Sequence, residues 1–359
     1  MARNSNPKQQ RLDPAKTPVK GAVREPVKQS SKVKIAETPT YEKKKPVTVK
    51  KRKGGRPGGR SPVPVVHPAT FGDWVAGARI RTLPLAIAPV ALGTAAAYAA
   101  SGFLDWHWVR ALLCLAVALG LQIGVNYAND YSDGVRGADT HRVGPSRLTG
   151  SGAAKPRTVL AVALVFFVLA AAAGVTVVVL SGQYWMLAVG AACILAAWFY
   201  TGGKHPYGYY GLGEVFVFLF FGLVATAGTT FVQVGTVNLE SWVAGTCAGL
   251  LACAVLVANN LRDIDQDRVA GKRTLTVLFG SLVSRILFTV FAILPFVGLA
   301  FFVLLYENAY LVYFCLLLAV PAAIIVLTAK TPKEFLLALK LTSLTALFFG
   351  VGLALAIAF

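Results

Sequence analysis

Long apolar runs constrain this chain more than any other feature of its sequence. After residue 60 there are nine runs whose length is near the ~20 residues that a helix needs to cross a bilayer. Helices are the expected structure, because a lone strand cannot satisfy its backbone hydrogen bonds in lipid. The runs cover residues 82–101, 107–129, 158–180, 183–201, 211–234, 241–260, 281–306, 308–329 and 335–358. The sequence therefore predicts an all-α integral membrane protein with nine transmembrane helices.

The first part of the chain has a different composition. Residues 1–60 hold 18 Lys and Arg against 4 Asp and Glu, and the whole chain carries a net charge of +19. So polar a segment cannot bury enough apolar surface to fold. We predict a disordered basic tail over residues 1–66 and a membrane domain over residues 67–359. The lysine runs of the tail suit an anionic lipid surface, and no specific nucleic-acid partner is expected.

Charge in the loops predicts the orientation of the nine helices. The loops after the second, fourth, sixth and eighth runs, with their flanks, carry Lys or Arg, and the other loops carry none. Basic loops stay on the cytoplasmic side of a membrane. We therefore expect a cytoplasmic N-terminus, an external C-terminus and a short amphipathic interfacial helix over Phe71–Arg81, ahead of the first span.

Acidic residues gather at two places. Of the 12 Asp and Glu after residue 60, six lie in two short segments at the cytoplasmic ends of predicted helices. The pairs Asn129–Asp133 and Asn259–Asp263 have the same four-residue spacing, which places each pair on one helix face. The two segments look like copies of one element. Their acidic residues are Asp130, Asp133, Asp139, Asp263, Asp265 and Asp267.

Carboxylates stacked on one helix face repel one another unless a cation compensates. Hard oxygen ligands favour Mg²⁺, which binds through a few carboxylates together with substrate phosphates. Nearby cations could neutralise a diphosphate, namely Arg142, Arg147, Lys204, Lys272 and Arg273. The pattern indicates a Mg²⁺–diphosphate site at the membrane boundary. The simpler alternative is that the carboxylates pair only with Lys and Arg of their own loops.

A third polar segment follows the fourth run, between Tyr200 and Glu214. It is rich in Gly and Tyr, which suits either the mouth of an apolar cavity or an interfacial aromatic belt. Glu214 is the only carboxylate near the start of the fifth run. The five cysteines all lie in apolar runs without metal-ligand spacing, so we expect them to be core residues.

These motifs resemble the UbiA superfamily of membrane prenyltransferases, which has nine transmembrane helices and two aspartate-rich motifs. Its first motif, Asn-x3-Asp-x3-Asp, is matched by Asn129-x3-Asp133, but the next aspartate, Asp139, comes two residues late. Its second motif is matched by Asp263-x3-Asp267, and its Tyr-x3-Lys by Tyr200 and Lys204.

Several longer segments are similar to the 1,4-dihydroxy-2-naphthoate prenyltransferase branch of that superfamily. They are Asn129-Asp-Tyr-Ser-Asp-Gly, Gly144-Pro-Ser-Arg-Leu-Thr-Gly-Ser-Gly, Pro206-Tyr-Gly-Tyr and Asn260-Leu-Arg-Asp. The resemblance covers about residues 70–359. It implies a Mg²⁺-dependent enzyme of the bacterial inner membrane that moves a polyprenyl group from polyprenyl diphosphate to 1,4-dihydroxy-2-naphthoate. Diphosphate and CO₂ leave, and the product is a demethylmenaquinone.

The resemblance also assigns roles to residues of this chain. The candidate metal ligands are Asp133, Asp139, Asp263, Asp267 and Asp130. The candidate diphosphate-binding residues are Arg142, Arg147, Lys272, Arg273 and Arg262. The candidate catalytic residues are Lys204, Tyr200, Asn129 and Asn259, of which Lys204 and Tyr200 would orient the acceptor or promote its deprotonation.

Other functions are consistent with parts of the pattern. A related transferase could act on 4-hydroxybenzoate, or transfer phosphoribose to a polyprenyl phosphate. A CDP-alcohol phosphotransferase would explain Asp130-x2-Asp133-Gly134, but its aspartates stand within one short stretch. A cation-coupled transporter would place its carboxylates near the middle of the bilayer. A non-catalytic lipid-binding protein would not need paired carboxylates.

Overall fold

The computed structural model describes residues 67–102, 107–137 and 147–359. These ranges make up most of the predicted membrane domain. The predicted tail, and the candidate site residues Asp139 and Arg142, lie outside the described residues.

Helices occupy all nine predicted positions. The spans are α2 (Pro84–Ser101), α3 (Trp108–Val135), α4 (Pro156–Ser181), α5 (Met186–Phe199), α6–α7 (Gly213–Val234), α8 (Leu239–Arg262), α10 (Leu275–Val303), η5–α11 (Glu307–Thr328) and α12 (Pro332–Ala358). Within the described part of the chain, eight of these segments are long and apolar enough to cross a membrane, and α5 is a shorter apolar helix. The predicted all-α membrane fold is confirmed, and the count of nine depends on including α5.

The span between α5 and α8 is not a uniform helix. It begins with α6 (Gly213–Val217), continues through a π-helical stretch, η4 (Phe218–Val224), and ends with α7 (Ala225–Val234). π-Helical turns are rare and occur frequently at functional sites. Here the wide turn contains Phe220 and Phe221, which both line a large cavity inside the bundle.

Two of the differences between predicted and observed boundaries bear on the site. The segment expected as one interfacial helix is divided into α1 (Phe71–Gly77) and the 3₁₀ turn η1 (Ile80–Thr82), because Arg79 has a left-handed backbone with φ 53°. This turn leads the chain into α2, whose first residue is a proline, a position that needs no N–H. At the other boundary, α3 continues six residues past its predicted end at residue 129, so Asp130 and Asp133 lie within the helix.

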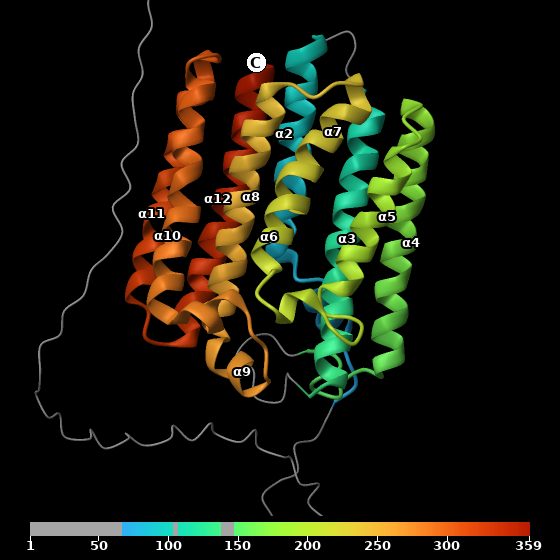
Figure 1. Ribbon diagram of the computed structural model, residues 1–359, viewed down its shortest axis with the longest axis vertical. Helices are drawn as coiled ribbons and strands as arrows, with labels where there is room; N and C mark the ends of the chain where they lie inside the picture. The colour runs from blue at the N-terminus through green and yellow to red at the C-terminus, as the bar shows by residue number, and fades with distance from the viewer. Residues whose placement is uncertain (1–66, 103–106, 138–146) are drawn as a thin grey trace, which may run out of the picture. The chain divides into compact units, whose positions relative to one another are not determined.

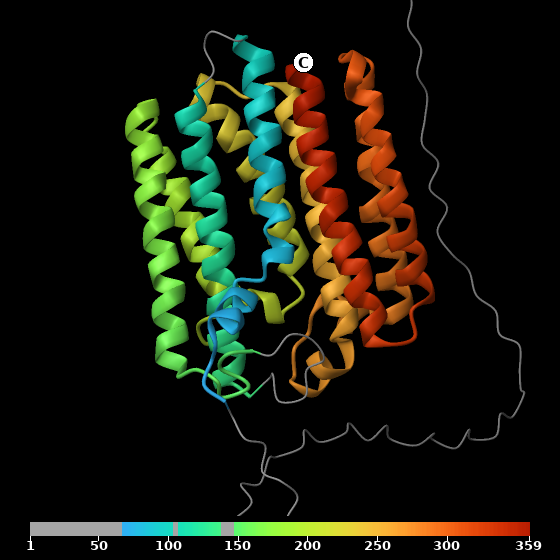
Figure 2. The ribbon, with the colours of Figure 1, turned by 180° about the vertical axis from the view of Figure 1, so that it is seen from behind.

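The spans are arranged in three groups (Figures 1 and 2). Helices α10, α11 and α12 form one side, and α3, α4 and α5 form the other, with α2, α8 and α6–α7 between them. The most extensive pairings are α3 with α4, α8 with α10 and α12 with α2. The short helix α9 (Ile264–Val269) lies at the same end of the bundle as the end of α3, and the C-terminus lies at the opposite end. We call the end that carries α9 the polar end.

Glycines allow the central helices to approach closely. A Cβ atom at Gly93 of α2 would lie 2.3 Å from the Thr226 carbonyl oxygen of α7, and one at Gly350 of α12 would lie 2.4 Å from the Ala88 Cβ. Lipid tails are as apolar as the helix surfaces, so helix association in a membrane depends on such close packing. These contacts hold the central helices around the site.

Replacing Gly93 by alanine should therefore destabilise the fold. The added methyl group must displace the Thr226 backbone, and overpacking of this kind costs about 1–3 kcal/mol. We expect a lower apparent Tm in detergent micelles. Gly190→Ala is the control, since a Cβ there would meet no atom within 4 Å. Equal Tm values for the two variants would contradict this view of the packing.

Candidate active site

Asp133 is the centre of the polar end. It lies near the end of α3 with only 3% of its surface exposed. Its Oδ1 accepts hydrogen bonds from the Tyr209 hydroxyl at 2.6 Å and from Lys272 Nζ at 3.2 Å. Its Oδ2 lies 3.5 Å from Nη2 of Arg147. Donors from three separate loops thus converge on one buried carboxylate.

Lys272 joins the two acidic segments that the sequence predicts. Its Nζ lies between Asp133 Oδ1 at 3.2 Å and Asp267 Oδ1 at 3.8 Å. Asp133 belongs to α3 and Asp267 to α9, so the fold brings together carboxylates that are far apart in the chain. The four-residue spacing within each segment could not by itself establish this meeting.

The third carboxylate of the group, Asp263, ends α8. Arg262 grips it through two charge-assisted hydrogen bonds, Nε to Oδ1 at 2.7 Å and Nη2 to Oδ2 at 2.6 Å. Arg262 Nη2 also donates to Asn259 Oδ1 at 2.9 Å. The backbone N–H of Asp267 donates to the carbonyl of Asp263 at 2.8 Å, so the chain keeps a helical turn between the two aspartates. A bidentate arginine fixes both the position and the plane of a carboxylate.

The loop after α5 is fastened to α3. The Thr201 hydroxyl donates to Asn129 Oδ1 at 2.6 Å, and Arg136 donates to the carbonyl oxygens of Thr201 and Gly203. The polar face of α3 therefore positions this loop, including Tyr200, against the carboxylates. Asn129, predicted as catalytic, makes its contact with this loop.

Tyr209, in the same loop, contacts three charged groups. Besides its bond to Asp133, its ring lies 4.7 Å from Lys272 Nζ and 5.4 Å from the guanidinium carbon of Arg136. Its backbone carbonyl accepts the N–H of Arg273 at 2.8 Å. Burial and the neighbouring Asp133 carboxylate raise the pKa of Tyr209, so its hydroxyl remains a donor at neutral pH. Tyr209 was not predicted as a site residue; its signals in the sequence are its place in the segment Pro206-Tyr-Gly-Tyr and among the tyrosines after residue 200.

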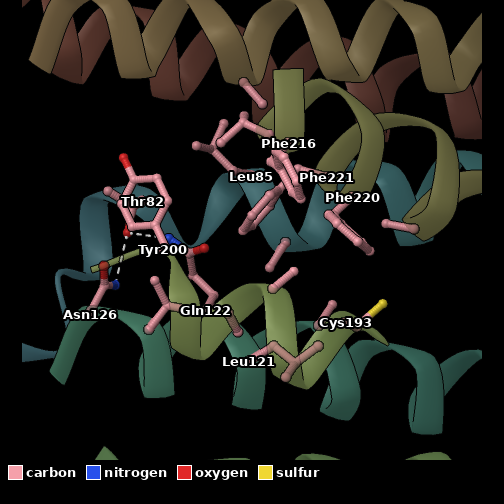
Figure 3. A pocket seen from close by; sticks show the side chains of 18 of the residues that line it. Thr82, Leu85, Leu121, Gln122, Asn126, Cys193, Tyr200, Phe216, Phe220 and Phe221 are labelled. Carbon is pink, nitrogen blue, oxygen red and sulfur yellow. Dashed lines mark hydrogen bonds between the residues drawn. The ribbon is translucent and has the colours of Figure 1, made fainter. Parts of the chain in front are cut away.

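A cavity of about 550 Å³ runs from the carboxylates into the bundle. Its polar end includes Asp133, Arg147, Asp263, Asp267 and Lys272, and its apolar part is lined mainly by α3, α4, α5 and α7. Figure 3 shows Tyr200 near the polar groups and three phenylalanines, Phe216, Phe220 and Phe221, farther along the cavity. The arrangement suits a molecule with an anionic head and a long apolar tail.

A small hydrogen-bond network lies where the wall of the cavity changes from polar to apolar. Gln122 and Asn126 of α3 both donate to the hydroxyl oxygen of Thr82, at 2.8 and 3.2 Å (Figure 3). Asn126 also donates to the carbonyl of Ala78. These bonds fix the start of α2 against α3.

Comparison with known sequences identifies the family. The family model described as "UbiA prenyltransferase family" matches residues 86–350. The chain belongs to the UbiA prenyltransferase family. A 1,4-dihydroxy-2-naphthoate octaprenyltransferase of Mycobacterium tuberculosis is 47% identical over 293 residues, which cover 81% of this chain and 98% of the relative.

Two solved structures of UbiA homologues share the fold. The apo structure of the homologue from Aeropyrum pernix K1 has a TM-score of 0.58 and 16% identity, covering 76% of this chain and 95% of that one. The Archaeoglobus fulgidus homologue bound to GPP and Mg²⁺ has a TM-score of 0.52 and 14% identity, covering 77% and 99%. At these identities the likeness concerns the fold alone.

Most of the candidate site residues of this UbiA protein line the cavity. They are Asn129, Asp130, Asp133, Arg147, Tyr200, Asn259, Arg262, Asp263, Asp267 and Lys272. Lys204 and Arg273 are exposed and are not among the lining residues. Their roles, and those of Asp139 and Arg142, remain predictions.

Asp130 has a different environment from the other aspartates. Its two oxygens accept the backbone N–H groups of Leu148, at 2.9 Å, and Thr149, at 2.8 Å. The side chain is 2% exposed, so these bonds are shielded from water. We infer that Asp130 holds the segment that carries Arg147 against α3; its predicted role as a metal ligand stays untested.

Glu214 is a second buried acid, placed behind the cavity wall. Its Oε1 accepts a hydrogen bond from Asn260 Nδ2 at 3.1 Å, and Asn260 lines the cavity. Within the described ranges, no Lys, Arg or His forms an ion pair with it. The sequence singled out this residue as the only acid at that entry but gave it no partner.

Asp130→Ala should destabilise the protein. Two buried backbone N–H groups would lose their acceptors, which costs about 1–3 kcal/mol each. We expect a clearly lower free energy of unfolding in mixed micelles. Asp265→Ala is the control, because its side chain is 90% exposed and its ion pair with Arg268 lies at the surface. If both variants were as stable as the wild type, the loop-holding role would be wrong.

Tyr209→Phe should lower prenyl-transfer activity without unfolding the protein. The variant keeps the ring between Lys272 and Arg136 but loses the bond to Asp133, which is worth about 1 kcal/mol or slightly more. We expect kcat/KM to fall about three- to tenfold, while Tm falls by only a few degrees. Tyr209→Leu should lose more, because it also removes the aromatic face. An unaffected rate in both variants would exclude Tyr209 from the site.

Proposed function

We propose that this chain transfers a polyprenyl group from polyprenyl diphosphate to 1,4-dihydroxy-2-naphthoate, with loss of CO₂ and diphosphate, giving a demethylmenaquinone in its quinol form. The observation that carries the proposal is the 47% identity to a naphthoate octaprenyltransferase over nearly the whole length of that relative. The cavity supports it, since charged groups stand at one end and apolar walls follow.

The residues at the polar end fit Mg²⁺. Asp133, Asp263 and Asp267 offer hard oxygen donors, and Lys272 Nζ already lies between two of them, so this position accepts positive charge. Within the described ranges no three such side chains form a complete metal site. Mg²⁺ does not require one, because it usually takes one or two carboxylates and completes its shell with water and substrate phosphates. When bound, Mg²⁺ would neutralise the diphosphate oxygens and make them a better leaving group.

The chain's own cations contribute to the same step. Arg147 and Lys272 already point at the Asp133 carboxylate, and Arg262 is fixed by Asp263. Cations held in place before the reaction stabilise charge as it develops on the leaving group. As the allylic C–O bond breaks, its electron pair passes to the diphosphate, and these residues would donate hydrogen bonds to the oxygens that gain negative charge.

The aromatic acceptor would approach the allylic carbon where the polar and apolar parts of the cavity meet. Tyr200, Asn259 and Asn260 line this region. We assign to them the orientation of the naphthoate ring. The ring carbon forms the new C–C bond, and the carboxylate leaves as CO₂ with its bonding pair returning to the ring.

We place the protein in the bacterial inner membrane with the polar end in the cytoplasm. The basic residues of four loops support this orientation, since Lys155, Lys204, Lys272 and Lys330 all follow spans that end on the same side. The charged head of the donor would then enter from the cytoplasm. The basic tail would contact anionic lipid.

A turnover assay in nanodiscs tests the proposal. We expect Mg²⁺-dependent product formation and CO₂ release from octaprenyl diphosphate with 1,4-dihydroxy-2-naphthoate, and none with 4-hydroxybenzoate. EDTA should abolish turnover. Asp133→Ala should also abolish it while the protein stays folded, with a lower Tm because Lys272 and Arg147 lose a buried partner. Turnover with the benzoate alone would overturn the acceptor, and full activity of Asp133→Ala would overturn the metal assignment.

A further inference from the structure

The cavity follows α3 for most of the length of that helix. Its lining residues recur every three or four positions, which places them on one face. They are Cys114, Val117, Ala118, Leu121, Gln122, Val125, Asn126, Asn129, Asp130 and Asp133. At 1.5 Å per residue, Cys114 and Asp133 are roughly 28 Å apart along the helix axis. That is close to the ~30 Å thickness of the hydrocarbon core of a bilayer.

Two groups of glycines in the spans differ in what surrounds them. In the first group a Cβ atom would collide with a neighbouring helix, as at Gly93, Gly350 and Gly124, where the nearest atoms are 2.3, 2.4 and 2.6 Å away. These glycines are explained by close helix packing. The second group lines the apolar part of the cavity and has no such neighbour.

Three cavity glycines come from three different helices. They are Gly174 of α4, Gly190 of α5 and Gly228 of α7. A Cβ atom would find its nearest neighbour at 3.7 Å at Gly174 and 3.6 Å at Gly228, and would meet nothing within 4 Å at Gly190. Glycine inside a helix costs about 0.5–1 kcal/mol relative to alanine. Neither packing nor a left-handed backbone requires glycine at these positions, and all three positions line the cavity, where a larger side chain would take up space.

We propose that Gly174, Gly190 and Gly228 keep the apolar part of the cavity open for the distal isoprene units of a long polyprenyl donor, and so determine the donor length that the protein accepts. This inference rests on the proposed function. We assign the polyprenyl tail to the apolar part because the same cavity begins at the carboxylates and cations that would hold the diphosphate. An apolar tail attached to that diphosphate can follow the apolar wall of this cavity.

Gly190 lies at a depth in the cavity that a long donor reaches and a short donor does not. It lies ten residues before Tyr200, which corresponds to about 15 Å along the chain of α5. A geranyl tail that starts beside Tyr200 ends before this level, whereas an octaprenyl tail passes it. A side chain at position 190 should therefore obstruct only the long donor.

The test is the full-length Gly190→Leu variant in nanodiscs, assayed with geranyl diphosphate and with octaprenyl diphosphate. We expect kcat/KM for the octaprenyl donor to fall about tenfold or more, the usual effect of steric misfit in an apolar pocket, while the geranyl value stays within about twofold. Ala192→Leu is the matched control, because Ala192 is exposed on the same helix and does not line the cavity. It should leave both donors unchanged. Equal effects of Gly190→Leu on both donors, or no effect on either, would overturn the inference.

A second measurement does not depend on turnover. Cys193 and Cys114 both line the cavity and stand at two depths, about 10 Å from Tyr200 along α5 and about 28 Å from Asp133 along α3. Labelling by N-ethylmaleimide, followed peptide by peptide with mass spectrometry, should be slowed at Cys114 by octaprenyl diphosphate with Mg²⁺ and not by geranyl diphosphate. In Gly190→Leu the octaprenyl donor should no longer protect Cys114.

The two measurements separate this inference from the proposed function. Protection of Cys114 by the long donor, together with failure to prenylate the naphthoate, would overturn the acceptor and leave the length inference standing. Naphthoate turnover without any donor-length difference at Cys114 would overturn the length inference and leave the function standing.

Discussion

The ion pairs of Lys272 with Asp133 and Asp267 hold the polar end of this protein together. Carboxylates at the edge of a bilayer are costly unless they are paired, and removing one partner of a buried pair leaves an uncompensated charge. Here one lysine faces acids from both halves of the chain. These ion pairs therefore hold the loop before α10 against the end of α3. The arginines of both acidic segments also neutralise the carboxylates.

Helix α3 links these ion pairs to the rest of the structure. Its last turns carry Asp133 and Asn129, which receive the loop after α5, while its earlier turns form the wall of the cavity. Asp130, on the same helix, holds the segment that carries Arg147. One straight element thus sets the positions of the acidic group, two loops and the apolar wall relative to one another.

Much of the fold can be predicted from the sequence, because span length and loop charge are read along the chain. The two acidic segments are also recognisable, since helical spacing is a local property. Local properties do not show which distant groups meet. Lys272 can be recognised as a cation near a motif, but its place between Asp133 and Asp267 depends on how α9 folds back. Tyr209 belongs to the segment Pro206-Tyr-Gly-Tyr, but that segment does not show that its hydroxyl contacts Asp133.

The same limit explains the boundary errors. Hydropathy falls at residue 129, which predicts the end of the helix there, whereas backbone hydrogen bonding continues to Val135 because the polar side chains find partners in the loops. At Arg79 the chain adopts a left-handed backbone to turn into α2, and an arginine does not predict that conformation. Asp130 differs in another way. Its residue type and position predict a metal ligand, but its carboxylate accepts hydrogen bonds from the backbone of a loop.

The unequal ends of the cavity also bear on how a reaction cycle would finish. All the charged side chains that could hold a substrate stand at one end, and the long wall beyond them is apolar. A donor is retained there by its anionic head, because its tail gains little over what the bilayer itself provides. Once diphosphate and CO₂ have left, the product has no anionic group for those residues to grip. The product then binds the protein about as weakly as it binds lipid, so it can leave the cavity into the membrane.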